Sequence, residues 1–152
     1  METPTIASQV YTGSKLTAVV PQNDGYEIVS NEGGTDVGEY DVVLKLSDET
    51  IYEWATPDSD DATKVTLKFA ITKAPNQITA LSLEGWTYGE EPKMPVATAQ
   101  FGTPTFAYGE TADGTFVETV PTAAGSYFVK AKVVATANYY VKPVFAVGAG
   151  TC

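Results

Sequence analysis

Histidine and arginine are both absent from this sequence of 152 residues, and its single cysteine, Cys152, is the last residue. One cysteine excludes an internal disulfide bond. The nine basic residues are all lysine and stand against nineteen acidic ones, which gives a formal net charge of -10. So few cations would not neutralise a phosphate backbone, and we expect no nucleic-acid partner. Acidic charge instead favours solubility and mutual repulsion, and we expect a monomer.

The same absences argue against catalysis. General acid–base catalysis near neutral pH most often uses histidine, and a nucleophilic serine or cysteine needs a base beside it. The adjacent carboxylates Asp60 with Asp61 and Glu90 with Glu91 are the local candidates for a two-carboxylate mechanism. Neighbouring residues of a strand point to opposite faces, and such pairs in loops are usually solvated. We therefore predict no catalytic residue and no enzyme activity.

Long apolar runs are missing too. No stretch approaches the roughly twenty apolar residues of a membrane-spanning helix. The first ten residues, METPTIASQV, do not combine a basic region with an apolar core as a signal peptide would. We interpret Met1 as an expression start, Cys152 as an added or partnerless terminal thiol, and the chain as a segment of a longer protein.

The sequence does contain a strand pattern that occurs twice. A Gly-x-Tyr triplet opens the pattern at Gly38 and again at Gly125, and apolar residues then alternate with other residues. Such alternation is typical of a half-buried strand. The residues predicted to face the core are Tyr40, Val42, Leu44 and Leu46 in the first copy and Tyr127, Val129, Ala131 and Val133 in the second.

Each copy continues with an aromatic pair and a closing strand. The aromatic pairs are Tyr52 with Trp54 and Tyr139 with Tyr140. The closing strands are built on Leu67, Phe69 and Ile71 in the first copy and on Phe145 and Val147 in the second. A pattern that recurs in the same order indicates a tandem repeat of two units.

The composition predicts an all-β chain. Nine prolines and thirteen glycines stand at turn-like positions, and no long stretch has the 3.6-residue period of a helix. We expect two tandem small antiparallel β-sandwich (Ig-like) modules, residues 1–74 and 75–152, joined stiffly at Ala74-Pro75-Asn76. Extra residues in the second module are assigned to a hairpin within 105–120. A partly open barrel or a β-grasp sheet is the structural alternative.

Several motifs of the second unit carry a resemblance to a known family. They are Trp86-Thr87-Tyr88-Gly89-Glu90, Pro92, Pro121, Ala124-Gly125-Ser126-Tyr127, Asn138-Tyr139 and Phe145-Ala146-Val147. With them the chain resembles the MBG repeats of large bacterial surface proteins, of the type that bears a Tyr-Gly-x signature. The first unit departs from this pattern: its opening reads Tyr11-Thr12-Gly13, its Asn-Tyr position is Ile51-Tyr52, and it carries an acidic insertion.

The resemblance implies an extracellular protein attached to a bacterial cell surface or cell wall. In such proteins the modules are strung together as a stalk or an adhesive arm, and the resemblance implies no catalytic residue. We expect a structural spacer whose partners are the neighbouring modules of the parent protein. The alternative is an adhesin module that itself binds a host glycan or protein.

The acidic insertion is the candidate metal site. Asp58, Asp60 and Asp61, with Asp48 nearby, offer the oxygen ligands that Ca²⁺ prefers. The spacing lacks the glycine and the distal glutamate of an EF-hand loop. The alternative interpretation is a solvated acidic loop without a metal or any other cofactor.

The aromatic pairs are the candidate ligand-binding residues. Tyr52, Trp54, Tyr139 and Tyr140 would stack on sugar rings or anchor a protein partner if their rings were exposed. The alternative is that these rings and Trp86 fill the cores of two small units. A further hypothesis is a cross-link between Lys45 or Lys132 and Asn31 or Asn138. The alternative is that these lysines only protect a sheet edge.

Overall fold

The computed structural model describes residues 1–140 and 142–151, with the side chains of residues 1–140. All of its regular elements are strands, so the prediction of an all-β chain is confirmed. No helix among these residues is long and apolar enough to cross a membrane. The chain divides into two compact units, Met1–Ala74 and Pro75–Cys152, which are described separately below. Cys152 and the interpretation of its thiol lie outside the described residues.

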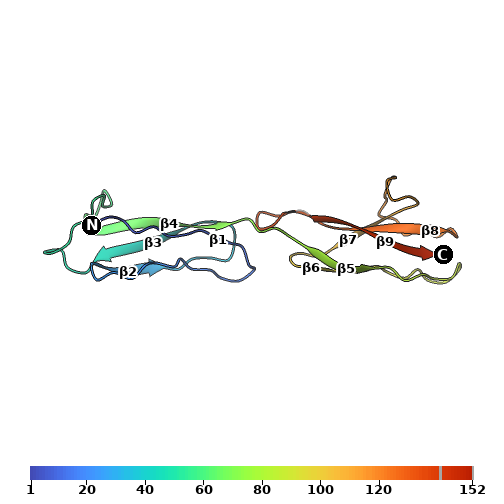
Figure 1. Ribbon diagram of the computed structural model, residues 1–152, viewed down its shortest axis with the longest axis horizontal. Helices are drawn as coiled ribbons and strands as arrows, with labels where there is room; N and C mark the ends of the chain where they lie inside the picture. Colours follow the sequence, from blue (N-terminus) through green and yellow to red (C-terminus); the bar gives the residue numbers. More distant parts are fainter. Residues whose placement is uncertain (141, 152) are drawn as a thin grey trace. The chain divides into compact units, whose positions relative to one another are not determined.

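The first unit contains one four-stranded sheet (Figure 1). Its strands are β1 (Gln9–Val10), β2 (Tyr26–Asn31), β3 (Gly38–Leu46) and β4 (Lys64–Thr72). Strands β2, β3 and β4 form an antiparallel meander, and the short β1 pairs in parallel with the outer edge of β4. The order across the sheet is therefore β1-β4-β3-β2.

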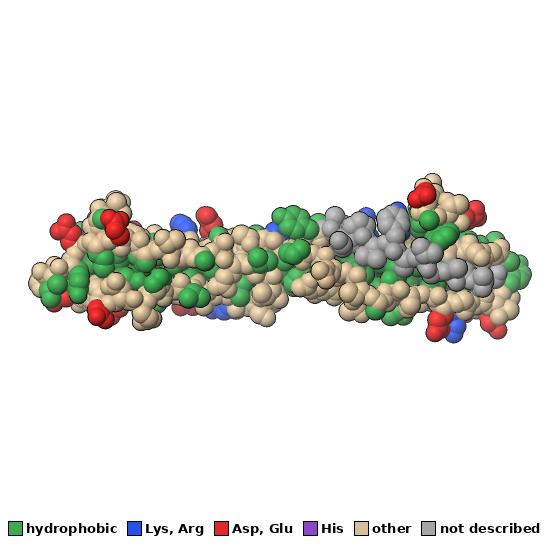
Figure 2. Space-filling model, in the orientation of Figure 1, with side chains coloured by type: hydrophobic (Ala, Val, Ile, Leu, Met, Phe, Trp, Pro, Cys, Tyr) green, Lys and Arg blue, Asp and Glu red, His purple; other side chains and the backbone are tan. Residues whose placement is uncertain are grey.

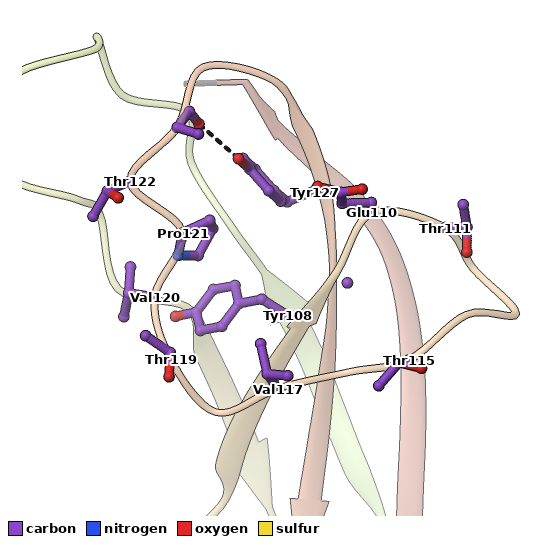
Figure 3. A pocket seen from close by; sticks show the side chains of 12 residues that line it. Tyr108, Glu110, Thr111, Thr115, Val117, Thr119, Val120, Pro121, Thr122 and Tyr127 are labelled. Carbon is purple, nitrogen blue, oxygen red and sulfur yellow. Dashed lines mark hydrogen bonds between the residues drawn. The ribbon is translucent and has the colours of Figure 1, made fainter.

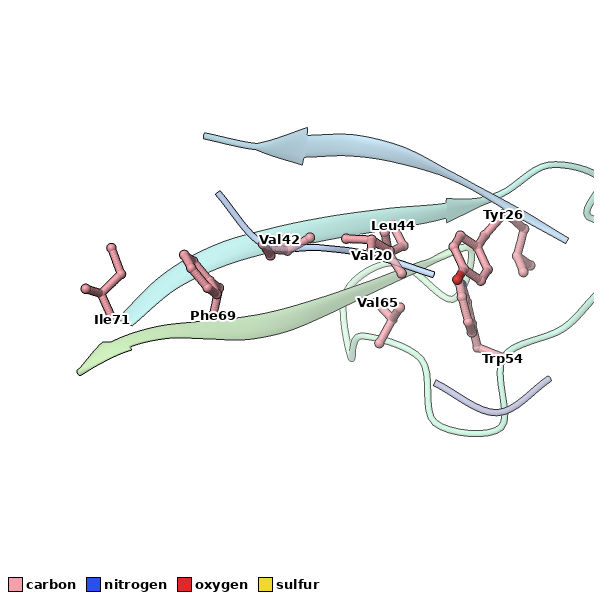
Figure 4. Close-up of a cluster of buried hydrophobic side chains, with 10 residues drawn as sticks. Val20, Tyr26, Val42, Leu44, Trp54, Val65, Phe69 and Ile71 are labelled. Carbon is pink, nitrogen blue, oxygen red and sulfur yellow. The ribbon is translucent and has the colours of Figure 1, made fainter. Parts of the chain in front are cut away.

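The alternation of β3 decides which face of this sheet is buried. Val42 and Leu44 are completely buried and Leu46 nearly so, while the residues between them stay partly exposed, which confirms the predicted pattern. Phe69 and Ile71 of β4 pack in the same cluster (Figure 4). Full burial of each such side chain contributes about 1.5–3 kcal/mol, so this single face supplies much of the unit's stability.

Irregular chain covers the buried face of the first sheet. Ala18 and Val20 belong to the core cluster but lie outside any strand. Asn31 holds this segment: its side chain accepts a hydrogen bond from the Ala18 amide (3.0 Å) and donates one to the Ala18 carbonyl (2.8 Å). Among the described residues of this unit, one sheet and an extended segment therefore stand where two facing sheets were expected.

The second unit has two smaller sheets. Strands β5 (Ile78–Ser82) and β6 (Val96–Ala99) form an antiparallel pair. Strands β7 (Thr105–Gly109), β8 (Ser126–Val133) and β9 (Lys142–Thr151) form an antiparallel meander with β8 in the middle. The inward residues of β8 are buried as predicted, from Tyr127 at 7% exposed to Ala131 at 0%. Of the hairpin expected within 105–120, the structure forms an isolated bridge: Tyr108 and Val117 exchange two backbone hydrogen bonds, but residues 115–120 form no strand.

Asn76 stabilises the beginning of the second unit. It is the one buried polar side chain recorded among the described residues, at 4% exposed. Its carbonyl oxygen accepts from the Phe101 and Gln77 amides, and its amide nitrogen donates to the Phe101 carbonyl, each at 3.0 Å. The amide group thereby replaces a stretch of strand pairing between two segments about 25 residues apart.

We predict that Asn76→Ala destabilises the second unit by about 1–3 kcal/mol, because it removes the two hydrogen bonds that the Asn76 side chain makes with the backbone of Phe101. Chemical denaturation followed by near-ultraviolet spectroscopy measures the change. The matched control is Gln77→Ala, since only the backbone of Gln77 takes part in this hydrogen bonding. An equal loss in both variants would contradict the assigned role.

Candidate functional site

The carboxylates of the acidic loop bind neighbouring parts of their own chain. Both oxygens of Asp58 accept hydrogen bonds from Thr66, one from its amide (2.9 Å) and one from its hydroxyl (2.7 Å). Asp61 accepts from the amide and the hydroxyl of Thr63 and forms an ion pair with Lys64 at 2.8 Å. The candidate Ca²⁺ ligands Asp58 and Asp61 thus fasten the loop to the start of β4.

These contacts shift the ionisation of the acidic loop. Hydrogen bonds from Lys64 and Thr63 hold the pKa of Asp61 well below its usual value of 3.8. The hydroxyl and amide of Thr50 likewise lower the pKa of Asp48. Among the described residues, no three acidic, histidine or cysteine side chains lie close enough to hold a metal ion, so the structure does not gather Asp48, Asp58, Asp60 and Asp61 into one site.

The lowered pKa values predict that acid weakens the first unit. A carboxyl whose pKa is depressed on folding adds stability above its unfolded value of 3.8, and this contribution is lost as the pH falls below that value. We expect the Tm of the first unit to fall as the pH is lowered through this range. Asp61→Asn lowers the Tm at neutral pH and reduces its fall in acid, whereas Asp60→Asn, which lacks these hydrogen bonds, does neither. Thermal denaturation at several pH values measures both effects.

The two candidate aromatic residues of the first unit, Tyr52 and Trp54, lie inward. Trp54 is only 3% exposed, its Nε1 donates to the Thr63 carbonyl (3.0 Å), and its ring packs on Tyr26 with centroids 5.7 Å apart. Tyr52 is partly buried against the same core. Trp54 therefore offers no open ring face to a ligand, and the alternative interpretation of a core residue describes it better. Trp86 of the second unit is also buried, at 7% exposed, as predicted.

The two candidate aromatic residues of the second unit, Tyr139 and Tyr140, differ in exposure. Tyr139 is partly buried and stacks on Phe101, with ring centroids 5.6 Å apart and planes 16° from parallel. Tyr140 is 54% exposed. Of the four candidate ligand-binding aromatics, Tyr140 alone presents most of its side chain at the surface.

The positions of Asn31, Lys45 and Lys132 do not favour a cross-link. The amide of Asn31 is engaged by the backbone of Ala18, as described above. Lys45 forms an ion pair with Glu49 at 3.7 Å, and Lys132 is exposed on β8. The positions of Lys45 and Lys132 agree with solvent-facing lysines rather than with a buried bond-forming pair.

A hollow of about 580 Å³ lies under the loop that follows β7, in a place that the candidate residues did not include. Figure 3 shows the loop arching over two tyrosines, Tyr108 of β7 and Tyr127 of β8. The loop contributes apolar side chains from Val117, Val120 and Pro121, and several threonines complete the lining. The sequence predicted that Tyr127 faces the core and that this loop is part of a hairpin within 105–120. No sequence motif predicted a hollow between them.

Tyr108 is the unusual group in this hollow. The side chain is 3% exposed, and its hydroxyl is buried with no hydrogen-bond partner among the described residues. Burial raises the pKa of the Tyr108 phenol, so the hydroxyl stays protonated at neutral pH. An unpaired buried hydroxyl costs about 1–3 kcal/mol, which makes it a group able to gain from a ligand.

On the face drawn in Figure 2, acidic side chains stand in separate places among hydrophobic and other polar atoms. Glu110 is the one carboxylate among the described residues that line the hollow, and that lining has no lysine.

No family model, no curated protein and no solved structure matches this chain.

Proposed function

We propose that the chain is a tandem pair of related β-sandwich modules that serve as spacers in a bacterial surface protein. The observation that carries this proposal is one hydrogen bond made in both units. The hydroxyl of Tyr40 donates to the carbonyl of Asp36 at 2.7 Å, and the hydroxyl of Tyr127 donates to the carbonyl of Ala123 at 2.6 Å. In each case the acceptor lies four residues before the tyrosine, across the Gly-x-Tyr turn.

The surroundings of this hydrogen bond also match. Tyr40 lies at the start of β3 and Tyr127 at the start of β8, and each strand is the middle one of an antiparallel meander. Near the start of each unit a tyrosine precedes a glycine with left-handed backbone, Gly13 at φ 83° and Gly89 at φ 87°. Two agreements at corresponding places support an origin by duplication.

The tyrosine bond further supports an Ig-like relationship. In immunoglobulin-type sandwiches a tyrosine near the start of a central strand hydrogen-bonds to the backbone a few residues upstream, an arrangement called the tyrosine corner. Tyr40 and Tyr127 meet this description in residue type, direction and spacing. Together with the MBG-like motifs, this hydrogen bond favours modules that act as spacers in a surface protein.

We expect Tyr40→Phe and Tyr127→Phe each to lower the free energy of unfolding of its own unit by about 0.5–1.5 kcal/mol, because the ring remains and only the hydrogen bond is lost. Denaturant titration of the full chain, with fluorescence of Trp54 reporting on the first unit and Trp86 on the second, separates the two effects. Tyr88→Phe, at an exposed tyrosine, is the control and leaves both transitions unchanged. A loss in one unit only would argue against equivalent tyrosines.

A spacer built from two modules should yield to force in two steps. We expect single-molecule stretching of the chain to show two unfolding events, each releasing roughly 250 Å at about 3.4 Å per residue. One event that releases the whole chain would contradict the proposed pair of modules.

The second candidate function is that of an adhesin module that binds a glycan or a host protein. Tyr140 is the observation that favours it, because its ring is largely exposed beside the stacked Tyr139. A glycan array with the wild-type chain and with Tyr140→Ala tests this alternative. Binding that Tyr140→Ala abolishes would support it, and binding that the change leaves intact would remove Tyr140 as its site.

A further inference from the structure

The two units have different residues at one corresponding position of their meanders. Asn31 of β2 lies opposite Val42, and Tyr108 of β7 lies opposite Val129. Val42 and Val129 each follow the tyrosine of the Gly-x-Tyr triplet by two residues. Asn31 and Tyr108 therefore occupy the same register position next to the tyrosine hydrogen bond.

In the first unit the protein itself fills the space at this position. The side chain of Asn31 is bound to both backbone groups of Ala18, and Leu16 forms a bridge with Gly34. A Cβ atom at Gly34 would lie 2.2 Å from the ring of Tyr40, so the chain here already touches the tyrosine. The Asn31 side chain is therefore hydrogen-bonded, and the backbone at Gly34 closes on the tyrosine ring.

In the second unit the same place is open. Pro121 stands six residues before Tyr127, as Gly34 stands six residues before Tyr40. The loop through Pro121 arches away from the sheet and leaves the hollow of about 580 Å³ (Figure 3). Tyr108, whose buried hydroxyl is unpaired among the described residues, belongs to its lining. Both the volume and the single unsatisfied polar group are typical of a small-molecule site.

We propose that this hollow, between the loop of residues 110–123 and the tyrosines Tyr108 and Tyr127, binds one neutral hexopyranose unit of a glycan. A pyranose ring has an apolar face and a rim of hydroxyl groups. Val117, Val120 and Pro121 offer an apolar wall for the face, and four threonines of the lining offer hydroxyl partners for the rim. The Tyr108 hydroxyl is covered in the free protein; when the sugar displaces the loop side chains that cover it, the hydroxyl donates to a sugar oxygen, which satisfies a group that the protein leaves unpaired.

The charges of the lining select against acidic sugars. Glu110 is the one carboxylate and no cation is present among the described lining residues, so a carboxylate on the ligand would lose its hydration without gaining a partner. This site is separate from Tyr140, and it does not depend on the spacer role of the modules.

The test uses the full chain labelled with ¹⁵N and titrated with glucose, galactose, mannose and N-acetylglucosamine. At least one of these neutral sugars is expected to shift, in a saturable manner, the amide signals of residues 108–123 and Tyr127. Tyr108→Phe should weaken that sugar about tenfold while the Tm stays the same or rises, because the change removes an unpaired hydroxyl. Tyr88→Phe, the control, leaves the affinity unchanged.

A second variant keeps the test independent of Tyr108. Thr119→Trp adds bulk at the exposed rim of the hollow and is expected to block the sugar without a change in fold. Two further ligands distinguish other occupants: N-acetylneuraminic acid, which is anionic, and indole, which is apolar. The proposal is overturned if no neutral sugar shifts these signals, if the shifts lie elsewhere, if Tyr108→Phe binds as tightly as the wild type, or if indole alone binds.

Discussion

Burial of one face of a central strand is the constraint on which both units depend. Strand β3 places Val42 and Leu44 entirely inside, and β8 does the same with Ala131 and nearly so with Val129. A unit of this size buries only about 60% of the surface that its unfolded chain exposes, so few other residues are available to form a core. The flanking strands, the covering segments and the loops are arranged around these inward side chains.

Polar side chains supply backbone hydrogen bonds where the short strands leave none. Asn31 and Asn76 each bind the amide and the carbonyl of one distant residue, as a paired strand would do. A buried segment without such partners would leave backbone groups unsatisfied, which proteins avoid. Irregular chain such as the segment around Ala18 can therefore cover a core face without becoming a strand.

Under the proposed duplication, the two units differ mainly in the loops beside the tyrosine. Both keep the tyrosine bond at Tyr40 and Tyr127, which ties the middle strand to the turn before it. In the first unit a close backbone contact at Gly34 leaves no space beside the ring. In the second unit the loop through Pro121 stands away, and the space beside the ring becomes a hollow. The proposed sugar site thus depends on the path of the loop beside Tyr127.

The sequence by itself determined the strands β3 and β8 and the faces that they bury, because alternation is a local property of an extended chain. It also predicted the all-β class, whereas of the hairpin expected within 105–120 only the bridge between Tyr108 and Val117 forms. It did not decide between core and surface for Trp54, whose burial depends on contacts with Tyr26 and Thr63 from other parts of the chain. The fastening of Asp58 and Asp61 to β4, and the unpaired hydroxyl of Tyr108, were likewise decided by the tertiary structure alone, since each depends on which distant segments meet.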